Sequence, residues 1–421
     1  MDGRDVPDFW DGAPRCLVTG RFRPQESSLG ALWRGRQRDR DRRALETLSL
    51  LRRPVSVGIQ RQSTAVTPHL GLGVCSPPAT LENMRARRVI GITLGVVLVV
   101  GGGGALALGD YVYREATSVP CGINADDANN SPERFTTPVE GPFTGEGWNQ
   151  WVGHDLSDWW LSDIPIETVT IPVSDEVTLE AWWIKASYPT AQETVIVTHG
   201  YGTSRRDYNT LLPSAMLAKE GFNVLLVDQR DTGNSTCVDG RHSAGQDESD
   251  DFAKVAQWLV AEKGITPDKI GMFGVSGGAI ATAILPAKTD NVTAFAMEAP
   301  IFDFAETVRR ELEFQGFPRF LSTLADTAAM IRGVDLNETP ITAGIDSAGN
   351  RPMLLLHGTD DRRLAYEGAV KFRDYAENAG VEITLETFEG AEHTEGMLSE
   401  TQRYQRALTT FFRNALGQTP N

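Results

Sequence analysis

The sequence contains little cysteine and none of the familiar nucleotide- or metal-binding motifs. Only four cysteines, Cys16, Cys75, Cys121 and Cys237, occur in 421 residues. They lack the close pairs that a structural zinc site needs and are too few for a fold built on disulfides. There is no Walker loop, no glycine fingerprint of a dinucleotide-binding fold and no EF-hand ligand spacing. We therefore expect neither a cofactor nor a bound metal.

Positive charge is scarce in most of the chain. The net charge is -16. Residues 1–88 contain 16 Arg and 9 acidic residues, so residues 110–421 carry -23, with 24 basic against 47 acidic side chains. Such an acidic body repels phosphate backbones, which excludes nucleic acid as its direct partner. The length and the 41% apolar content predict one large core with additional segments.

Residues 89–109 form a run of 21 residues without a charged side chain. As a helix this run would be about 31 Å long, which matches the hydrocarbon core of a bilayer. Arginines precede it at positions 85, 87 and 88, and Asp110 follows it. By the positive-inside rule, the N-terminus is expected to stay in the cytoplasm and the acidic body to be exported. We predict that residues 84–109 are a basic flank and a single transmembrane anchor in the cell membrane.

Other interpretations of the N-terminal part stay open. Residues 105–107, Ala-Leu-Ala, resemble a signal-peptide cleavage site, and the apolar run would also suit a buried core helix. Residues 1–83 have no sustained apolar period and are expected to be a disordered tail. Met84 begins Met-Arg-Ala-Arg-Arg directly before the apolar run, which is typical of a membrane-targeted N-terminus. Translation that starts at Met84, with residues 1–83 absent from the native protein, is therefore a second possibility.

The exported body contains an irregular segment followed by alternating strands and helices. Residues 110–160 are rich in Asp, Asn, Pro, Gly and Thr and predict a linker. The domain that follows, residues 161–417, begins with an expected antiparallel hairpin and continues with strands separated by helices. The expected strands are residues 168–173, 178–185, 194–198, 223–227, 269–275, 292–297, 353–356 and 382–388. This order predicts an α/β fold, with a mostly parallel sheet and helices on both faces.

A candidate nucleophile lies where the expected strand 269–275 meets a helix. Residues 274–278 read Gly-Val-Ser-Gly-Gly and fit the pattern G-x-S-x-G. In this pattern the serine occupies a strained strand-to-helix turn that exposes its Oγ, and glycines two residues away permit close packing. Ser276 is therefore the predicted nucleophile.

Two later strands end at residues that can complete a catalytic triad. The strand 353–356 runs into His-Gly-Thr-Asp-Asp at 357–361, and the strand ending at 388 runs into Gly-Ala-Glu-His at 390–393. A triad in the chain order Ser, acid, His requires these places. His393 is the predicted base, and His242 is a remote alternative. The candidates for the acid are Asp361, Asp360 and Glu298.

With these motifs the sequence resembles the α/β-hydrolase superfamily over residues 167–416. Within it, the chain is similar to serine aminopeptidase-like and esterase-like hydrolases, including membrane-anchored bacterial ones. The pentapeptide at 357–361 matches the family pattern H-G-T-x-D, which assigns the acid to Asp361. The resemblance implies an oxyanion hole formed by the backbone N–H groups of Tyr201 and Gly277, and residues 299–350 have room for a small helical cap. The resemblance also implies a structural role for the loop at 228–235, which matches the family pattern D-x-R-x-x-G-x-S. In this role Arg230 is expected to pair with a carboxylate.

The sequence thus predicts a membrane-anchored serine hydrolase that needs no cofactor. Its substrate would be a small or lipid-like acyl compound or a peptide, cleaved at an ester, thioester or amide bond. The alternative is a catalytically inactive surface binding protein with the same fold.

Cys121 and Cys237 are the only cysteines that follow the predicted anchor. In an oxidising compartment their pairing is plausible, although both thiols staying free or pairing between chains are alternatives. Residue 121 lies close to the anchor in sequence, and residue 237 lies in a loop on the expected active-site face. A bridge would therefore turn that face toward the membrane and favour a lipid-borne substrate.

Overall fold

The structure is a computed structural model of the chain. It divides into residues 1–78 and 79–421, and all described residues belong to the second unit. The described residues are 103–114, 117–119, 121–122, 130–138, 152–186, 192–314, 318, 320–331 and 340–417. The predicted tail and the first part of the predicted anchor, residues 89–102, lie outside them. Residues 103–114 are helical. No helix among the described residues combines the length and the apolar character needed to cross a membrane.

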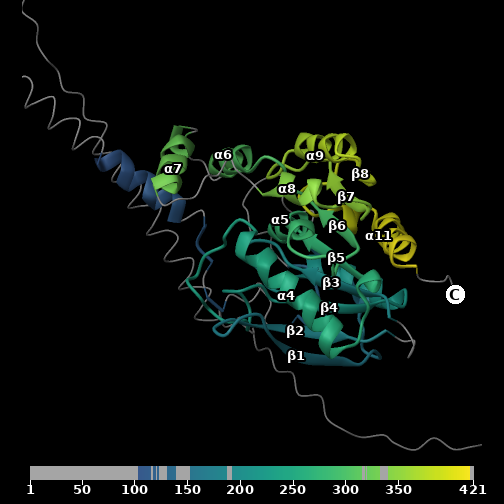
Figure 1. Ribbon diagram of the computed structural model, residues 1–421. Coiled ribbons are helices and arrows are strands. Elements are labelled where there is room, and N and C mark those ends of the chain that lie inside the picture. Colours follow the sequence, from purple (N-terminus) through teal and green to yellow (C-terminus); the bar gives the residue numbers. More distant parts are fainter. Residues whose placement is uncertain are drawn as a thin grey trace, which may run out of the picture. The chain divides into compact units, whose positions relative to one another are not determined.

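Eight strands form one sheet (Figure 1). The strands are β1 (Ile166–Pro172), β2 (Thr178–Ile184), β3 (Thr194–Thr198), β4 (Asn223–Val227), β5 (Ile270–Val275), β6 (Ala294–Glu298), β7 (Met353–Gly358) and β8 (Ile383–Phe388). Their order in the sheet is β1-β2-β4-β3-β5-β6-β7-β8. β2 pairs antiparallel with β1 and β4, and all other pairs are parallel. The expected hairpin and mostly parallel sheet are both present.

Helices cover both faces of the sheet. The central strands β3 to β7 are buried along their whole length and therefore consist of nearly continuous apolar runs. One core lies between the sheet and α4 (Gln246–Glu262), α5 (Gly277–Ile284), α8 (Ile341–Asp346) and α9 (Tyr366–Asn378). The other lies between the sheet and α3 (Tyr208–Lys219), α10 (Gly396–Ser399) and α11 (Thr401–Leu416). The described part of the chain also contains three short 3-10 helices: η1 (Ser157–Trp159), η2 (Pro267–Lys269) and η3 (Leu285–Ala287).

The region after β6 contains two cap helices, α6 (Phe304–Phe314) and α7 (Phe320–Ile331). The helix of residues 103–114 lies beside α7 (Figure 1). Its Val112 belongs to a small apolar cluster with Leu312 of α6 and Leu321 of α7. By contrast, α8 belongs to the main body. A Cβ atom on Gly344 would lie 2.0 Å from the carbonyl oxygen of Ala283 in α5, so only glycine permits this close packing. The cap is therefore shorter than the predicted residues 299–350.

Candidate active site

Ser276 lies at the sharp turn between β5 and α5. Its backbone has φ +49° and ψ -110°, which is a strained conformation for a residue with a side chain. A Cβ atom on Gly274 would lie 2.3 Å from the carbonyl oxygen of Gly278, and one on Gly278 would lie 2.5 Å from that of His199. The two flanking glycines of the motif are thus needed because backbone atoms occupy the space of a side chain.

Ser276, His393 and Asp361 form one chain of hydrogen bonds. Nε2 of His393 lies 3.1 Å from Oγ of Ser276, and Nδ1 of His393 lies 2.7 Å from Oδ2 of Asp361. The three residues follow β5, β8 and β7, so they meet at the carboxyl edge of the sheet. The backbone N–H of Ser276 donates to the carbonyl oxygen of Glu298 at 2.8 Å, which fixes the turn against β6. This geometry is that of a nucleophile, a base and a group that orients the base.

Asp361 is held in its charged form. Its Oδ1 accepts hydrogen bonds from the backbone N–H groups of Arg363 at 2.9 Å and Leu364 at 2.7 Å. Burial would raise the pKa of Asp361, but the charge of His393 and the hydrogen bonds from His357 and His393 outweigh it, and the pKa lies well below its ordinary value. A carboxylate with so low a pKa orients the imidazole and does not take its proton.

The alternative residues lie elsewhere. Asp360 is exposed, and its Oδ1 accepts from the Thr359 hydroxyl at 3.3 Å. The side chain of Glu298 is fully buried, and neither of its oxygens has a hydrogen-bond partner among the described residues. His242 reaches the wall of the same cavity, while its Nδ1 accepts from the backbone N–H of Ala244. Of the three acid candidates, all of them described in the structure, only Asp361 is in hydrogen-bond contact with His393.

The loop after β3 lies against the nucleophile turn. A Cβ atom on Gly277 would lie 2.7 Å from the backbone nitrogen of Tyr201, so these two backbones are in direct contact beside Ser276. The ring of His199 connects this loop to the loop after β4. Its Nδ1 donates to the Gly200 carbonyl oxygen at 2.8 Å, and its Nε2 accepts from the Gln229 backbone N–H at 3.1 Å. Burial lowers the pKa of His199, which keeps it neutral for these two roles. The arrangement suits the predicted oxyanion hole, which stays a prediction.

The D-x-R loop is a structural element, as expected. Arg230 makes two hydrogen bonds of 2.7 Å to the carboxylate of Asp251 in α4. Asp228 accepts from the backbone N–H of Arg205 at 2.8 Å and from its guanidinium at 2.7 Å. The backbone of Gly233 approaches Asp228 so closely that a Cβ atom there would lie 1.9 Å from Oδ2. These contacts hold the loop beside β3, and none of them involves Ser276, His393 or Asp361.

Ser276 and His393 line a cavity of about 160 Å³. Its remaining wall is mainly apolar and comes from α5, the loop after β6, α6 and the loop after β7, with Ile280, Ile301, Phe304, Val308, Leu312 and Leu364. Tyr111, Val112 and Thr117, from the segment expected to be a linker, also line it, as does the ion pair of Arg363 with Glu311. Sequence reasoning missed these three residues, because no local pattern shows that the segment returns to the active site.

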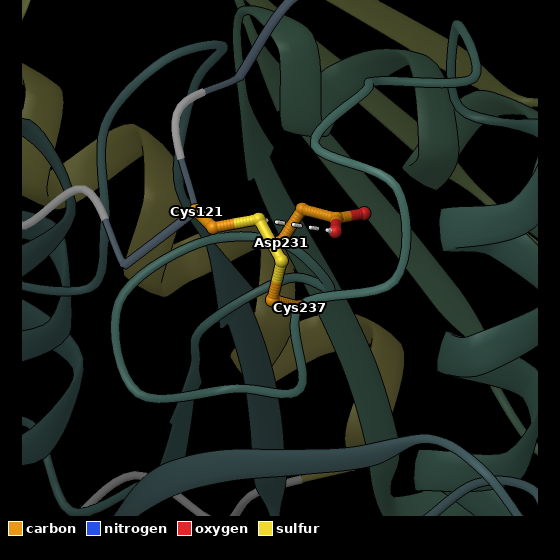
Figure 2. Close-up of side chains that lie close together, drawn as sticks. All are labelled: Cys121, Asp231 and Cys237. Carbon is orange, nitrogen blue, oxygen red and sulfur yellow. Dashed lines mark hydrogen bonds between the residues drawn. A yellow bond between two sulfur atoms is a disulfide. The ribbon is translucent and has the colours of Figure 1, made fainter.

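A disulfide joins Cys121 to Cys237 (Figure 2). Beside it, Oδ1 of Asp231 accepts three backbone N–H groups, from residues 238, 239 and 240. Because both sulfurs are bonded to each other, the group of Asp231 and the two cysteines offers no thiolate to a metal. Three more hydrogen bonds fasten the segment at 117–119 to the body, including one from the Tyr201 hydroxyl to the Ser118 carbonyl oxygen at 2.7 Å. The bridge thus holds one wall of the cavity in place.

Replacing Gly277 by alanine is expected to lower kcat by about 10²- to 10³-fold. The new methyl group would displace the Tyr201 amide, and the loss of one oxyanion donor costs this much in comparable enzymes. Steady-state kinetics on an activated ester will measure the effect. Gly368→Ala is the matched control, because a Cβ atom there meets nothing within 4 Å and φ is not positive. Equal kcat for Gly277→Ala and wild type would contradict the predicted role of the Tyr201 amide.

The buried Glu298 is expected to make the fold less stable as the pH rises. Burial raises the pKa of Glu298 well above its ordinary value, and the charge of Asp361 adds to this rise. A carboxyl group with a raised pKa in the folded state contributes its full stability below the unfolded pKa of about 4.3 and loses it as the pH rises toward the folded value. Glu298→Gln removes this dependence, so urea unfolding of the variant should show a smaller loss of stability between pH 5 and pH 8. The same pH slope in both proteins would contradict the assignment.

Comparisons with known proteins agree with this architecture. The prolyl oligopeptidase family matches residues 210–419, a range that includes Ser276, Asp361 and His393. Human protein ABHD12B is 29% identical over 204 residues, which are 47% of this chain and 53% of that protein. The chain therefore spans about half the length of this curated relative.

Two solved structures show the same fold. The esterase Pf2001 of Pyrococcus furiosus has 22% sequence identity and a TM-score of 0.50, covering 63% of this chain and 97% of that one. The acylaminoacyl peptidase of Pyrococcus horikoshii has 16% identity and a TM-score of 0.50, covering 62% of this chain and 43% of that one. At these sequence identities, the structural similarity shows a shared fold and nothing about function.

Proposed function

We propose that the chain is a serine hydrolase of the α/β-hydrolase superfamily, of the esterase and peptidase kind, and that it is a membrane-anchored enzyme that cleaves acyl compounds through Ser276, His393 and Asp361. The observation that carries the proposal is the unbroken chain of hydrogen bonds from Ser276 Oγ through His393 to Asp361.

In the proposed mechanism, Oγ of Ser276 attacks the acyl carbonyl carbon while Nε2 of His393, at 3.1 Å, takes the hydroxyl proton. Asp361 stabilises the imidazolium that forms. The backbone N–H groups of Tyr201 and Gly277 bind the oxyanion of the tetrahedral intermediate. His393 then returns the proton to the leaving group, and water releases the acyl group from Ser276 by the same steps. No cofactor enters this scheme.

The cavity favours an apolar acyl group. Its wall contains Ile280, Phe304 and Leu312 close to the nucleophile, and such a surface binds hydrocarbon by the hydrophobic effect. Esters, thioesters and amides all react through the same triad, so the bond that is cleaved has to be found by experiment.

The position of the cavity supports a membrane location. The predicted anchor ends at residue 109, and Tyr111 and Val112 directly after it line the cavity. Large apolar side chains of the same region are exposed: Leu106 and Leu108 in the helix of residues 103–114, and Phe320, Met330 and Ile331 in α7. We therefore place the cap and the cavity near the outer surface of the bilayer, where a lipid-borne acyl chain can enter.

The function is tested on the full chain in detergent with acyl esters of increasing chain length, the matching thioesters and aminoacyl amides. We expect hydrolysis of at least one class, with kcat/KM rising with acyl length, and loss of hydrolysis in Ser276→Ala. A fluorophosphonate should label wild type once, at Ser276. Absence of both labelling and hydrolysis would favour the alternative, an inactive surface binding protein with this fold.

The membrane location is tested with protease added to intact cells. If the N-terminus is cytoplasmic, the protease should digest the body and spare the residues before Arg88. A body that is protected until the membrane is broken would reverse the proposed orientation, and a soluble chain that begins near residue 108 would show cleavage of a signal peptide.

A further inference from the structure

A second cavity adjoins the active-site cavity. Its volume is about 240 Å³, and its wall comes from the loop after β6, α6, the loop after β7 and the start of α9. Three residues, Ile301, Thr307 and Leu364, belong to the walls of both cavities. At this place the two cavities are therefore only one layer of residues apart.

Leu364 is held firmly in this layer. Its backbone N–H donates to Oδ1 of Asp361 at 2.7 Å, and its carbonyl oxygen accepts from Nε2 of His357 at 3.0 Å. The residue is only 7% exposed and belongs to the apolar core between the sheet and α9. Both hydrogen bonds come from the backbone, so a smaller side chain at this position keeps the groups that make them.

The active-site cavity is small for an acyl chain. Its volume is about 160 Å³. An apolar protein cavity of about 150 Å³ holds one benzene molecule, which has about the size of a six-carbon chain. By this measure the cavity holds an acyl group of about six carbons, and a longer chain meets the layer that contains Leu364.

The second cavity has room for the end of a longer chain. Its volume exceeds that of the active-site cavity. Pro300, Phe302 and Ala365 add apolar surface to its wall, beside charged side chains such as Asp303 and Lys371. The barrier to such a chain is thus the layer between the two cavities.

We propose that Leu364 is a specificity-determining residue: its side chain closes the active-site cavity toward the second cavity and limits the acyl group of the substrate to about six carbons. This inference rests on the proposed function and specifies its substrate class as esters of short acyl groups. It also sets an upper limit to the rise of kcat/KM with acyl length.

The p-nitrophenyl esters of butanoic, hexanoic, octanoic and decanoic acid test this limit on the full chain in detergent. In wild type we expect kcat/KM to rise up to the hexanoate and to be at least about tenfold lower for the decanoate, because one methylene in an apolar pocket changes kcat/KM by about 10- to 200-fold. In Leu364→Ala the ratio of decanoate to hexanoate should be at least about tenfold higher than in wild type. All proteins are measured in the same detergent, so partition of the esters into micelles affects every ratio equally.

Gly368 permits a test of the path through the second cavity. It lies in the first turn of α9 and lines the second cavity but not the active-site cavity. A Cβ atom on Gly368 would meet nothing within 4 Å, so Gly368→Leu can narrow the second cavity. In the double variant Leu364→Ala/Gly368→Leu the ratio should return toward that of wild type. Gly368→Leu alone should have the wild-type ratio.

Leu364→Val provides a second test if Leu364→Ala does not fold. It makes the side chain smaller by one carbon and should raise the ratio of decanoate to hexanoate by a smaller factor. Labelling of Ser276 by a fluorophosphonate shows for each variant that the triad still reacts.

The outcomes separate this inference from the proposed function. Equal kcat/KM for hexanoate and decanoate in wild type, or the wild-type ratio in each Leu364 variant that folds, would overturn the role of Leu364 while leaving the triad in place. A ratio that stays high in the double variant would overturn the path through the second cavity. Wild type that is labelled at Ser276 but hydrolyses none of the four esters would overturn the substrate class. Wild type that is neither labelled nor active would overturn the proposed function, and this inference with it.

Discussion

Ser276→Ala is expected to lower kcat for ester hydrolysis by about 10⁴- to 10⁶-fold, and His393→Ala by a similar factor. Each change breaks the hydrogen bond of 3.1 Å between Oγ and Nε2, so neither residue can act without the other. The double variant should therefore be no slower than the slower single variant. Steady-state kinetics on an activated ester, with the residual rate compared with hydrolysis in buffer, will measure all three.

The expected kcat of the double variant assumes that Ser276 and His393 act as one unit. If the two factors multiplied in the double variant, Ser276 and His393 would contribute independently, and the proposed acyl-enzyme mechanism would be wrong. Gln405→Ala is a suitable control, because this side chain lies on α11 and bonds to Glu220, remote from the triad loops. Its kcat should equal that of wild type.

Removal of the disulfide is expected to lower the free energy of unfolding by about 4 kcal/mol. Cys121 and Cys237 are 116 residues apart in sequence, and closing a loop of this size restricts the unfolded chain strongly. Urea unfolding of the double variant Cys121→Ser/Cys237→Ser, compared with wild type, will give the difference. Because the bridge holds the segment of Thr117 at the cavity, kcat/KM should fall as well.

The control for this experiment is the double variant Cys16→Ser/Cys75→Ser, which removes the two cysteines that precede the predicted anchor. Its unfolding should match that of wild type. A wild-type protein whose unfolding midpoint is the same with and without dithiothreitol would contradict the expected contribution of the bridge.

The central strands could be predicted closely from the sequence. The predicted bounds of β3 and β4 are those of the structure, because buried parallel strands are unbroken runs of apolar and β-branched residues that end at polar ones. β6 was predicted at residues 292–297 and lies at Ala294–Glu298. A buried carboxylic acid as the last residue of a strand has no local signature, which explains the shift at the C-terminal end.

Of the candidate site, only the residues that directly follow strands could be predicted from the sequence. Ser276, Asp361 and His393 each follow a strand, and strands that share a direction bring their ends to one edge of the sheet. Tyr111 and Thr117 follow no such pattern. Their places depend on the contact between Ser118 and Tyr201, 83 residues apart, and on the packing of residues 103–114 against the cap. Contacts of this kind arise from tertiary packing, which composition and periodicity do not record.

β8 is the last strand along the chain and lies at one edge of the sheet, and this position affects when activity appears during synthesis. His393 follows β8 and is 117 residues away from Ser276. A growing chain can contain the nucleophile turn and most of the sheet while it still lacks the base. The triad becomes complete only after β8 has paired with β7 and His393 has left the ribosome. For a chain that is exported, as proposed here, this order keeps the unfinished protein from hydrolysing acyl compounds on the cytoplasmic side of the membrane.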